Sequence, residues 1–489
     1  MTTSPEKLVK RMFSDSIATY VSGLISVLLW LVFLSNLCII ITYFPQNLDW
    51  QWNNFIRING FTLLLSTTIS FLGAIICTYA KSYFKDPEQK SRFMIHCLGF
   101  IMAVLFFIIS NHVILLVIGW FLMGLLISKL IGMDTNWGEA RESKRVAVQY
   151  FVAGSFLLTI GLLLLAYFNN SLFISDLMLN IDEIPQFIKV TSSLCIITAA
   201  LVQSAIFPFH KWLLSSMTAP TPASALMHAG FVNGSGILLT IVAPLIIASN
   251  TLDILLLLGG LSAILAQFIK LIQVNVKQRL ACSTIAQMGF MIMQCGLGFF
   301  NAAITHLILH SFYKASLFLS NGNEIEQLNP KTPPQIHIKW YQGIIVIIFS
   351  LLGAYSFAQL TYKGLKWDSG ILLTLIASIT VGQITYNIVK QSTFNVWQKI
   401  IFPPVLFMSG IVIYALFYNL TTLTLKGFNV IEVSKSISTL QIGFGLIFLI
   451  GFFLMKLGIY RKLPWLYVKL LNISLPHKKS ILMYKNKIQ

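Results

Sequence analysis

The chain has 489 residues, of which 56% are hydrophobic and 10% are charged, and its mean hydropathy is +0.79. This balance excludes an ordinary water-soluble domain, in which about a quarter of the residues are charged. The formal net charge of +18 is compatible with a nucleic-acid-binding protein, so the positions of the basic residues must decide that question.

Apolar runs of 18 residues or more recur along the whole chain. Each is long enough to cross about 30 Å of hydrocarbon as a helix. Segments of about ten residues with alternating polarity, which predict a membrane β-barrel, do not occur. The sequence therefore predicts an all-α polytopic membrane protein of about 14 transmembrane helices, in a single integral membrane domain over residues 1–489. The predicted spans are 17–43, 58–80, 93–110, 111–131, 146–168, 188–209, 223–248, 252–274, 281–298, 300–320, 341–362, 370–389, 400–421 and 438–458.

The basic residues gather on one side of these predicted spans. The N-terminus, the even-numbered loops and a basic tail at 456–489 share that side, which receives 27 of the 34 Lys and Arg residues. Acidic residues show no such bias. This is the positive-inside pattern, and it predicts that both termini are cytoplasmic. The charge therefore reports topology and does not indicate nucleic acid. The tail also has the composition to lie on anionic lipid or to bind a partner.

Three prolines interrupt the sequence FPFHKWLLSSMTAPTPASALMHAG at 207–230. Pro208, Pro220 and Pro222 each lack a backbone N–H and clash with the preceding turn, so a continuous helix is not expected here. Transporters use broken helices to bind ions, with protein or a water-filled cavity satisfying the freed carbonyls. The break lies between two predicted spans, so a plain connecting loop is the alternative. Asn233, which follows it among small residues, suits close helix packing and a hydrogen bond across helices.

Ionisable residues cost several kcal/mol at bilayer depth, so those within apolar spans usually mark an ion or proton path. In the apolar stretch 198–325 the candidates are His228, Lys270, His306, His310 and Lys314. The last three are spaced i, i+4 and i+8, which places them on one slowly turning face of a helix. Histidine suits a proton relay because its unperturbed pKa is near 6.5 and its two ring nitrogens accept and donate in turn. The alternatives are histidines satisfied by neighbouring helices and a Lys270 that extends to the membrane surface.

The sequence offers little other chemistry. Six cysteines, at positions 38, 77, 97, 195, 282 and 295, lie in apolar runs without paired metal spacing and are interpreted as small core residues. His306 and His310 match the spacing of helical metal ligands, but a lysine follows one turn later and no carboxylate is near. We expect no metal, no cofactor and no catalytic site in this chain.

Three segments resemble the proton-translocating, antiporter-like family that includes large membrane subunits of respiratory complex I and of Mrp-type sodium/proton antiporters. They are FPFHKWL…APTPASALMHAG (207–230), VNVKQRLACSTIAQMGFM (274–291) and AAITHLILHSFYKASLFLSNG (302–322). The resemblance implies an antiporter-like core at 93–325 with a helix break near 208–222. The candidates for the proton or ion path are His228, Lys270, His306, His310, Lys314, Gln203 and Asn233.

Within that family the chain is most similar to the DabB type, the membrane subunit of an inorganic-carbon accumulation complex. The similarity lies in SSMTAPTPASALMHAGFVN, in the run that carries Lys270 to Asn275, and in ACSTIAQMGFMIMQCGLGFF. This similarity implies an energy-coupling cation channel in the bacterial inner membrane. In the preferred interpretation, the conducted cation is the proton. The similarity also implies a large soluble partner of the DabA type, related to carbonic anhydrases, whose zinc converts CO2 to bicarbonate.

Three alternative functions remain open. The chain resembles subunits of sodium/proton antiporters and of quinone-linked complex I, and a scaffold that only anchors a soluble enzyme is the third possibility. The scaffold predicts that each ionisable residue of the path is dispensable.

Two departures from the family pattern weaken the complex I alternative. Gly119 and Trp120 are followed by Phe121, where many antiporter-like subunits have Glu, and the lysine that pairs with this Glu aligns with Gln203. Residues 341–389 also lack the expected acid- and lysine-bearing helix and offer only Gln383 as a buried polar candidate.

The central residues then define the expected route. We expect protons to enter from the outer face through the cavity at the broken helix and to reach His228. They then pass to His310 and His306, with Lys314 setting the local potential.

Overall fold

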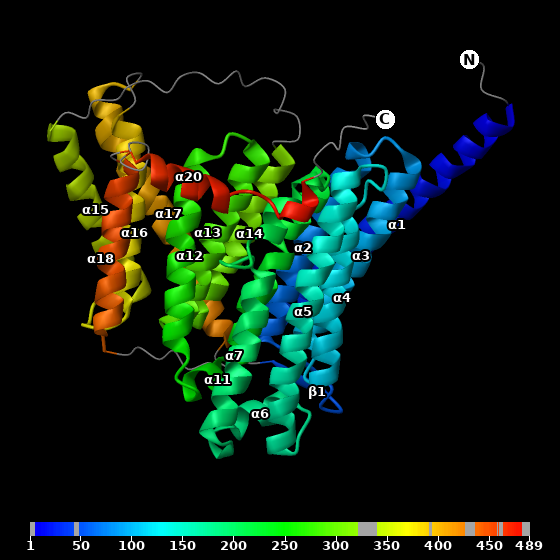
Figure 1. The fold of residues 1–489 in the computed structure, drawn as a ribbon, viewed down its shortest axis with the longest axis horizontal. Helices are drawn as coiled ribbons and strands as arrows, with labels where there is room; N and C mark the ends of the chain where they lie inside the picture. Colours follow the sequence, from blue (N-terminus) through cyan, green and yellow to red (C-terminus); the bar gives the residue numbers. More distant parts are fainter. Residues whose placement is uncertain are drawn as a thin grey trace.

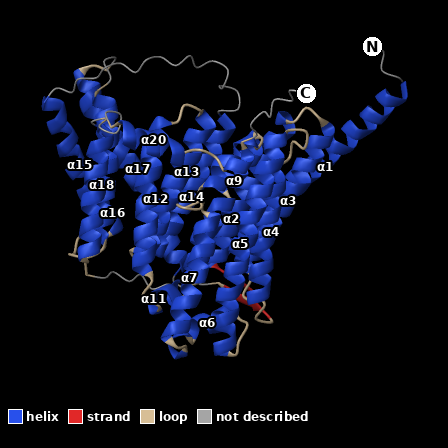
Figure 2. Cartoon of the chain, in the orientation of Figure 1, coloured by secondary structure: helices blue, strands red, loops and turns tan. Residues whose placement is uncertain are grey.

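The computed structural model describes residues 5–43, 48–320, 340–390, 394–425, 436–456, 458 and 463–481. Within these ranges the chain is helical apart from one short hairpin and the connecting loops (Figure 2). Long helices run side by side through one bundle, with α15 to α18 at one edge of the view in Figure 1. The predicted all-α class is confirmed.

The bounds of the elements follow the chain. The long helices are α1 Pro5–Tyr43, α2 Gly60–Tyr83, α3 Pro87–Ile109, α4 Val113–Ile131, α5 Gly138–Asn169, α7 Gln186–Gln203, α12 Leu252–Ile272, α13 Val276–Gly296, α14 Phe300–Ser320, α15 Trp340–Thr361, α16 Gly370–Val389, α17 Val396–Leu425 and α18 Thr439–Lys456. The shorter elements are β1 Asp49–Trp52, β2 Ile56–Asn59, α6 Ile174–Leu179, η1 Ile181–Glu183, α8 Lys211–Ser215, η2 Ser216–Thr218, α9 Thr221–Ala229, η3 Phe231–Asn233, α10 Gly234–Ile241, α11 Ala243–Ala248, α20 Pro464–Ile473 and η4 Lys478–Ser480.

Eleven of the described helical segments are long and apolar enough to cross a membrane, which does not confirm the predicted count of about 14. α13 and α14 have 21 residues each and coincide with predicted spans, yet they are not among the eleven. Polar side chains lower their hydropathy, and these two helices contribute much of the candidate path. α18, the third predicted span outside the eleven, contains only a shorter apolar segment, Thr439–Met455.

The two ends of the bundle differ in their short elements. β1 and β2 pair antiparallel, from Asp49 opposite Asn59 to Trp52 opposite Ile56, and lie with α6 at one end. Asn111, in the turn between α3 and α4, joins them because its N–H donates to the Phe55 oxygen at 2.8 Å and its Oδ1 accepts from the Ser175 N–H at 3.0 Å. α20 lies across the long helices at the opposite end (Figure 1).

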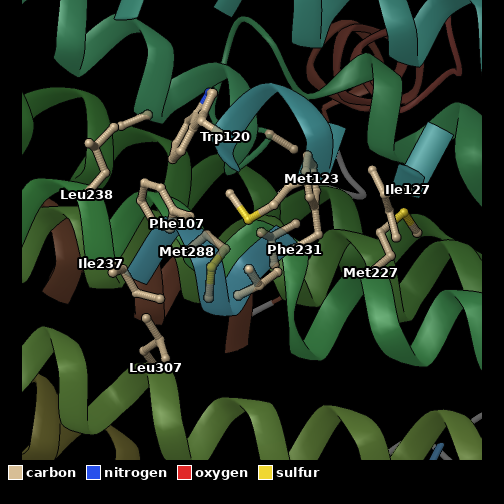
Figure 3. Packing of buried hydrophobic residues seen from close by; sticks show 14 of the residues in the cluster. Phe107, Trp120, Met123, Ile127, Met227, Phe231, Ile237, Leu238, Met288 and Leu307 are labelled. Atoms are coloured by element: carbon tan, nitrogen blue, oxygen red, sulfur yellow. The ribbon is translucent and has the colours of Figure 1, made fainter. Parts of the chain in front are cut away.

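Large apolar side chains from α3, α4, α9, α10, α13 and α14 fill the centre of the bundle (Figure 3). The rings of Phe107 in α3 and Trp120 in α4 lie 5.4 Å apart. Phe231, in the short η3 segment, packs against the ring of Phe151 in α5 at 4.6 Å. The core therefore surrounds the irregular segment between α9 and α10.

Glycines bring α12 and α13 into backbone contact. A Cβ on Gly259 would lie 2.6 Å from the oxygen of Gly289 and 2.6 Å from the nitrogen of Met293. A Cβ on Gly296 would lie 2.3 Å from the nitrogen of Leu256. Helices in membranes associate largely through such close packing of small residues. This contact fixes α13 beside α12, and Lys270 lies in the last turn of α12.

The variant Gly259→Ala is expected to lower the free energy of unfolding by about 1–3 kcal/mol, because the backbone of α13 must move to admit the methyl group. Thermal unfolding of the purified protein in detergent measures the change. Gly443→Ala in α18 is the matched control, since its new Cβ has nothing within 4 Å. Equal unfolding midpoints for both variants would show that the two helices do not depend on this contact.

Candidate functional site

The predicted helix break near 208–222 is present, but it lies in a connection between helices. α7 ends at Gln203, and irregular turns lead to α8. Pro220 is the N-cap residue of α9, and Pro222 stands in its first turn, where a missing N–H leaves no helical bond unmade. The connection is buried: the Trp212 side chain is inaccessible, and its Nε1 donates to the oxygen of Val202 at 2.8 Å.

A second interruption, which the sequence analysis did not identify, lies inside the following span. Residues Thr221–Ile241 form one candidate span, but α9 ends at Ala229 and α10 begins only at Gly234. The intervening η3 segment leaves backbone oxygens without their usual helical partners. This break is buried in protein, as a non-helical segment at membrane depth must be.

Side chains from α7 and the residue after it satisfy the freed oxygens. Gln203 Nε2 donates to the oxygen of Phe231 at 3.2 Å, and Ser204 Oγ donates to the oxygen of Val232 at 3.1 Å. A Cβ on Gly234 would lie 2.5 Å from Gln203 Nε2, so the glycine is needed for this close approach. Gln203 thus supports the second break, where the family pattern has a lysine.

Asn233 connects this second break to α14. Its Nδ2 donates to the oxygen of Ala229 at 2.7 Å and to Ser311 Oγ at 2.7 Å. Asn233 Oδ1 has no partner among the described residues although the side chain is buried. The predicted hydrogen bond of Asn233 across helices is therefore present. Its partner Ser311 was not predicted, because nothing in the sequence around it distinguishes it from other small polar residues of a helix.

His306, His310 and Lys314 follow one another along a single face of α14. The rings of His306 and His310 are nearly parallel, with centroids 6.1 Å apart and planes at 14°. Lys314 is fully buried, and its Nζ donates to the oxygen of Leu280 in α13 at 3.1 Å. Both nitrogens of His310 and Nε2 of His306 lack a hydrogen-bond partner among the described residues. These imidazoles have unused capacity to bind a proton or a water molecule.

His228 joins this row from α9. The side chain is fully buried, and its ring stacks on that of Phe318 in α14, with centroids 4.5 Å apart and planes at 10°. Neither of its ring nitrogens has a hydrogen-bond partner in the described part of the chain. His228, His310 and Lys270 all interact electrostatically with Lys314. We call His228, His306, His310 and Lys314 the basic row; Lys270, only half-buried, lies beside it.

No Asp or Glu is buried among the residues whose side-chain burial the structure describes. The three ion pairs recorded there, Arg57–Asp49, Arg92–Glu88 and Arg145–Glu142, lie at the surface. The described residues also contain no group of three His, Cys, Asp or Glu side chains that could hold a metal. Among the residues whose burial is described, no buried carboxylate therefore balances the basic row.

The positions of these residues reverse the expected order of the path. Phe318, on which His228 stacks, lies one turn beyond Lys314, whereas His306 lies near the opposite end of α14. The 204–220 connection contacts α20, at the end of the bundle that the charge pattern assigns to the cytoplasm. If the termini are cytoplasmic, as the charge pattern predicts, a proton from the outer face would meet His306 before His228, which is the reverse of the predicted order.

Two further positions named in the sequence analysis are exposed. Phe121, at the position where the family has Glu, is 36% exposed on the outside of α4. The α4 side chain that lies near Gly234, beside Gln203, is instead that of Met123. Gln383 is exposed, so its interpretation as a buried polar residue is wrong. Phe121 thus lies on the outer side of α4, whereas Gln383 is exposed at a cavity that His306 also lines.

Part of the basic tail packs onto the 204–218 segment. His210 Nε2 donates to the oxygen of Ile473 at the end of α20 at 2.9 Å. Ser215 Oγ accepts from the His477 N–H and from Ser480 Oγ, each at 2.9 Å. Residues 464–481 therefore close over the connection that follows α7.

The contact between His210 and the tail is expected to weaken in acid. Burial, together with the charge of Lys211, lowers the pKa of His210 to about 4, against the opposing effect of its hydrogen bonds to the backbone of Ile473 and Pro208. The docked form therefore binds fewer protons than the undocked form, whose pKa is near 6.5. The stabilisation is complete above about pH 6.5 and is lost as the pH falls toward 4.

Hydrogen exchange of residues 464–481, corrected for its intrinsic pH dependence, tests this at pH 7.5 and pH 5. We expect faster exchange at pH 5 in the native chain and no such change in His210→Gln, whose amide keeps a donor and does not titrate. Acid-induced exchange that persists in His210→Gln would assign the effect to another group.

Three comparisons with known proteins place this site in a family. Residues 110–333 match the family model described as NADH:quinone oxidoreductase/Mrp antiporter, TM. The structure is similar to a chain of the Mrp complex from Dietzia sp. DQ12-45-1b, with a TM-score of 0.57 and 19% identity, over 96% of this chain and 52% of that one. At this identity the likeness shows the fold alone. The fold and the matched region define an antiporter-like membrane subunit.

The sequence relatives specify the family further. The probable inorganic carbon transporter subunit DabB of Hydrogenovibrio crunogenus is 30% identical over 450 residues, which cover 87% of this chain and 82% of the relative. The NADH-quinone oxidoreductase subunit L of Pseudomonas aeruginosa is 30% identical over 289 residues, or 56% of this chain and 46% of the relative. The chain belongs to the DabB family of probable inorganic carbon transporter subunits, and the predicted resemblance is confirmed.

Proposed function

We propose that this chain is the energy-coupling cation channel, for protons, of an inorganic-carbon uptake complex. In this proposal a soluble, zinc-dependent partner of the DabA type hydrates CO2 to bicarbonate, and cation entry through this chain drives the reaction in one direction. The termini face the cytoplasm of a bacterial inner membrane, as the positive-inside pattern predicts. The observation that carries the proposal is the basic row, whose imidazoles have buried ring nitrogens without a hydrogen-bond partner among the described residues.

The geometry of the basic row suits a relay of protons. The imidazoles of His306 and His310 are too far apart, at 6.1 Å between centroids, for one ring to bond directly to the next, so one water molecule must bridge them. Each ring then receives a proton at one nitrogen and releases one at the other. Lys314, held at the oxygen of Leu280, lies beyond His310 and takes the proton toward the end where His228 lies.

The same geometry favours protons over sodium. Sodium is a hard cation that binds to oxygen ligands, and carboxylates balance its charge where it is dehydrated. The residues whose burial is described include no buried carboxylate, and the basic row would repel a metal cation. Imidazole and amine groups accept protons and bind sodium poorly.

Growth at atmospheric CO2 of a bacterium that lacks its own carbonic anhydrases tests the function. We expect growth to be rescued when this chain is expressed together with the soluble protein that co-purifies with it from its native cells. We also expect that soluble protein to contain zinc. His310→Ala should abolish rescue, as should a protonophore, whereas replacement of sodium by potassium should leave it unchanged.

His96→Ala is the matched control, because His96 is a half-buried histidine whose Nδ1 bonds to the oxygen of Arg92, away from the basic row. Rescue by His310→Ala at the native level would contradict the proton path. Co-purification of several antiporter-like subunits in place of a soluble zinc protein would contradict the carbon-uptake role.

A further inference from the structure

A cavity of about 510 Å³ lies between α12, α13 and α14 on one side and α15 to α18 on the other. Its walls are mostly apolar, and no Asp, Glu, Lys or Arg lines it. Four residues on its α16–α17 wall are also exposed on the outside of the chain: Thr380, Gln383, Leu406 and Gly410. The cavity therefore opens sideways, toward the lipid of a surrounding membrane.

Polar groups stand on the wall formed by α12, α13 and α14. Gln294 is 2% exposed, and its Oε1 has no hydrogen-bond partner among the described residues. His306 also lines the cavity, and its Nε2 is likewise unpartnered in the described part of the chain. Gln267 and Gln287 add two more amides on the same wall. A buried amide oxygen without a hydrogen-bond donor is destabilising, so a ligand that supplies a donor is favoured.

We propose that this cavity binds an uncharged membrane amphiphile with a hydroxyl headgroup, of the kind found in diacylglycerols and quinols. An apolar cavity with few polar groups and a volume of this size is typical of a small-molecule site. A hydroxyl donates to Gln294 Oε1 and accepts from an amide or imidazole N–H, and the apolar walls take the chain. The uncharged lining excludes bicarbonate and metal cations, so this site is distinct from the transport path.

The ligand would occupy one end of the basic row. Its headgroup would lie against His306, the member of the row that shares a wall with the cavity. A bound hydroxyl would then connect the membrane interior to the proton relay by a hydrogen bond. Binding of the ligand would set the orientation of the His306 ring. In the described part of the chain, this ring lies 5.2 Å from the ring of Phe290 and stacks on the ring of His310.

Photo-cross-linking in lipid nanodiscs tests the proposal. The probe is a diacylglycerol with a diazirine in one acyl chain, and cross-linked residues are identified by mass spectrometry. We expect labelling of cavity-lining residues in the native chain and competition by unlabelled dioleoylglycerol, by reduced decylubiquinone, or by both, which identifies the source of the hydroxyl. The methyl ether of dioleoylglycerol, which lacks the hydroxyl, should compete at least about tenfold less well, the factor expected for one hydrogen bond.

Two cavity-filling variants and one control complete the test. Gly410→Trp places an indole at the opening, where a Cβ meets nothing within 4 Å, and Gly451→Leu fills the interior, where the nearest atom to a new Cβ is Ile264 Cγ2 at 3.6 Å. Both should lower labelling of the cavity about tenfold. Gly443→Trp, on α18 outside the cavity, should leave it unchanged. Native labelling in both filling variants, or equal competition by the methyl ether, would overturn the proposal.

Discussion

Lys314→Met is expected to abolish transport-coupled activity while leaving the fold intact. Methionine is close to lysine in length. Lys314 is fully buried and has no carboxylate partner among the described residues, so removing its ammonium group relieves the cost of a desolvated charge. The relay loses the group that takes a proton from His310, and activity should fall by about 100-fold or more, the range typical of a lost proton-transfer group. CO2-dependent growth and proton uptake into proteoliposomes that contain the partner measure this loss, and thermal unfolding checks the fold.

The control for Lys314→Met is Lys189→Met. Lys189 is also buried, at 8% exposed, but it lies in the first turn of α7, at the α6 end of the bundle. We expect this variant to keep its activity. Loss of activity in both would attribute the effect to the removal of any buried lysine, and full activity in Lys314→Met would remove Lys314 from the path.

Gln203→Leu is expected to destabilise the second helix break. The Phe231 oxygen accepts from Gln203 Nε2 and is enclosed by protein, so removing the donor leaves a buried acceptor unpaired at a cost of about 1–3 kcal/mol. The thermal midpoint should fall, and hydrogen exchange of residues 221–241 should increase. Activity should fall with it, because Asn233 ties the same break to α14.

Gln186→Leu provides the comparison for this second prediction. Gln186 also donates through Nε2 to a backbone oxygen, that of Ala248, at 3.3 Å, but this contact is exposed and water replaces it. We expect a change in stability of only a few tenths of a kcal/mol, as for most surface substitutions. Equal destabilisation by the two variants would show that burial of the Phe231 oxygen does not matter.

Hydropathy and helical spacing were sufficient to predict the fold class and the alignment of the basic row. The i, i+4, i+8 spacing places His306, His310 and Lys314 on one face whatever surrounds the helix, because the helical period alone determines it. The prolines likewise located the first break, since their backbone chemistry is local. Such predictions need no knowledge of which helices are neighbours.

The second break and the order of the row depend on contacts between distant segments. Gly230, Asn233 and Gly234 suit close packing in a continuous helix as well as they suit an interruption. Only the approach of Gln203, 28 residues before Phe231, stabilises the interruption. The same limit applies to Phe121 and Gln383, because helix rotation follows from packing. Asn233 and Gly234 within an apolar span were the available signal, but they did not distinguish the two cases.

The contact between the tail and the 204–218 segment has a consequence for biosynthesis. His210 and Ile473 are 263 residues apart in sequence, so the ribosome makes the partner of His210 long after His210 itself. At about 5–20 residues per second this interval is roughly 13–50 s. During that time the connection after α7 has no cover from α20, and a chaperone or the insertion machinery has to shield it. A translating ribosome that stalls before residue 464 would release a chain in which this segment stays open to proteolysis.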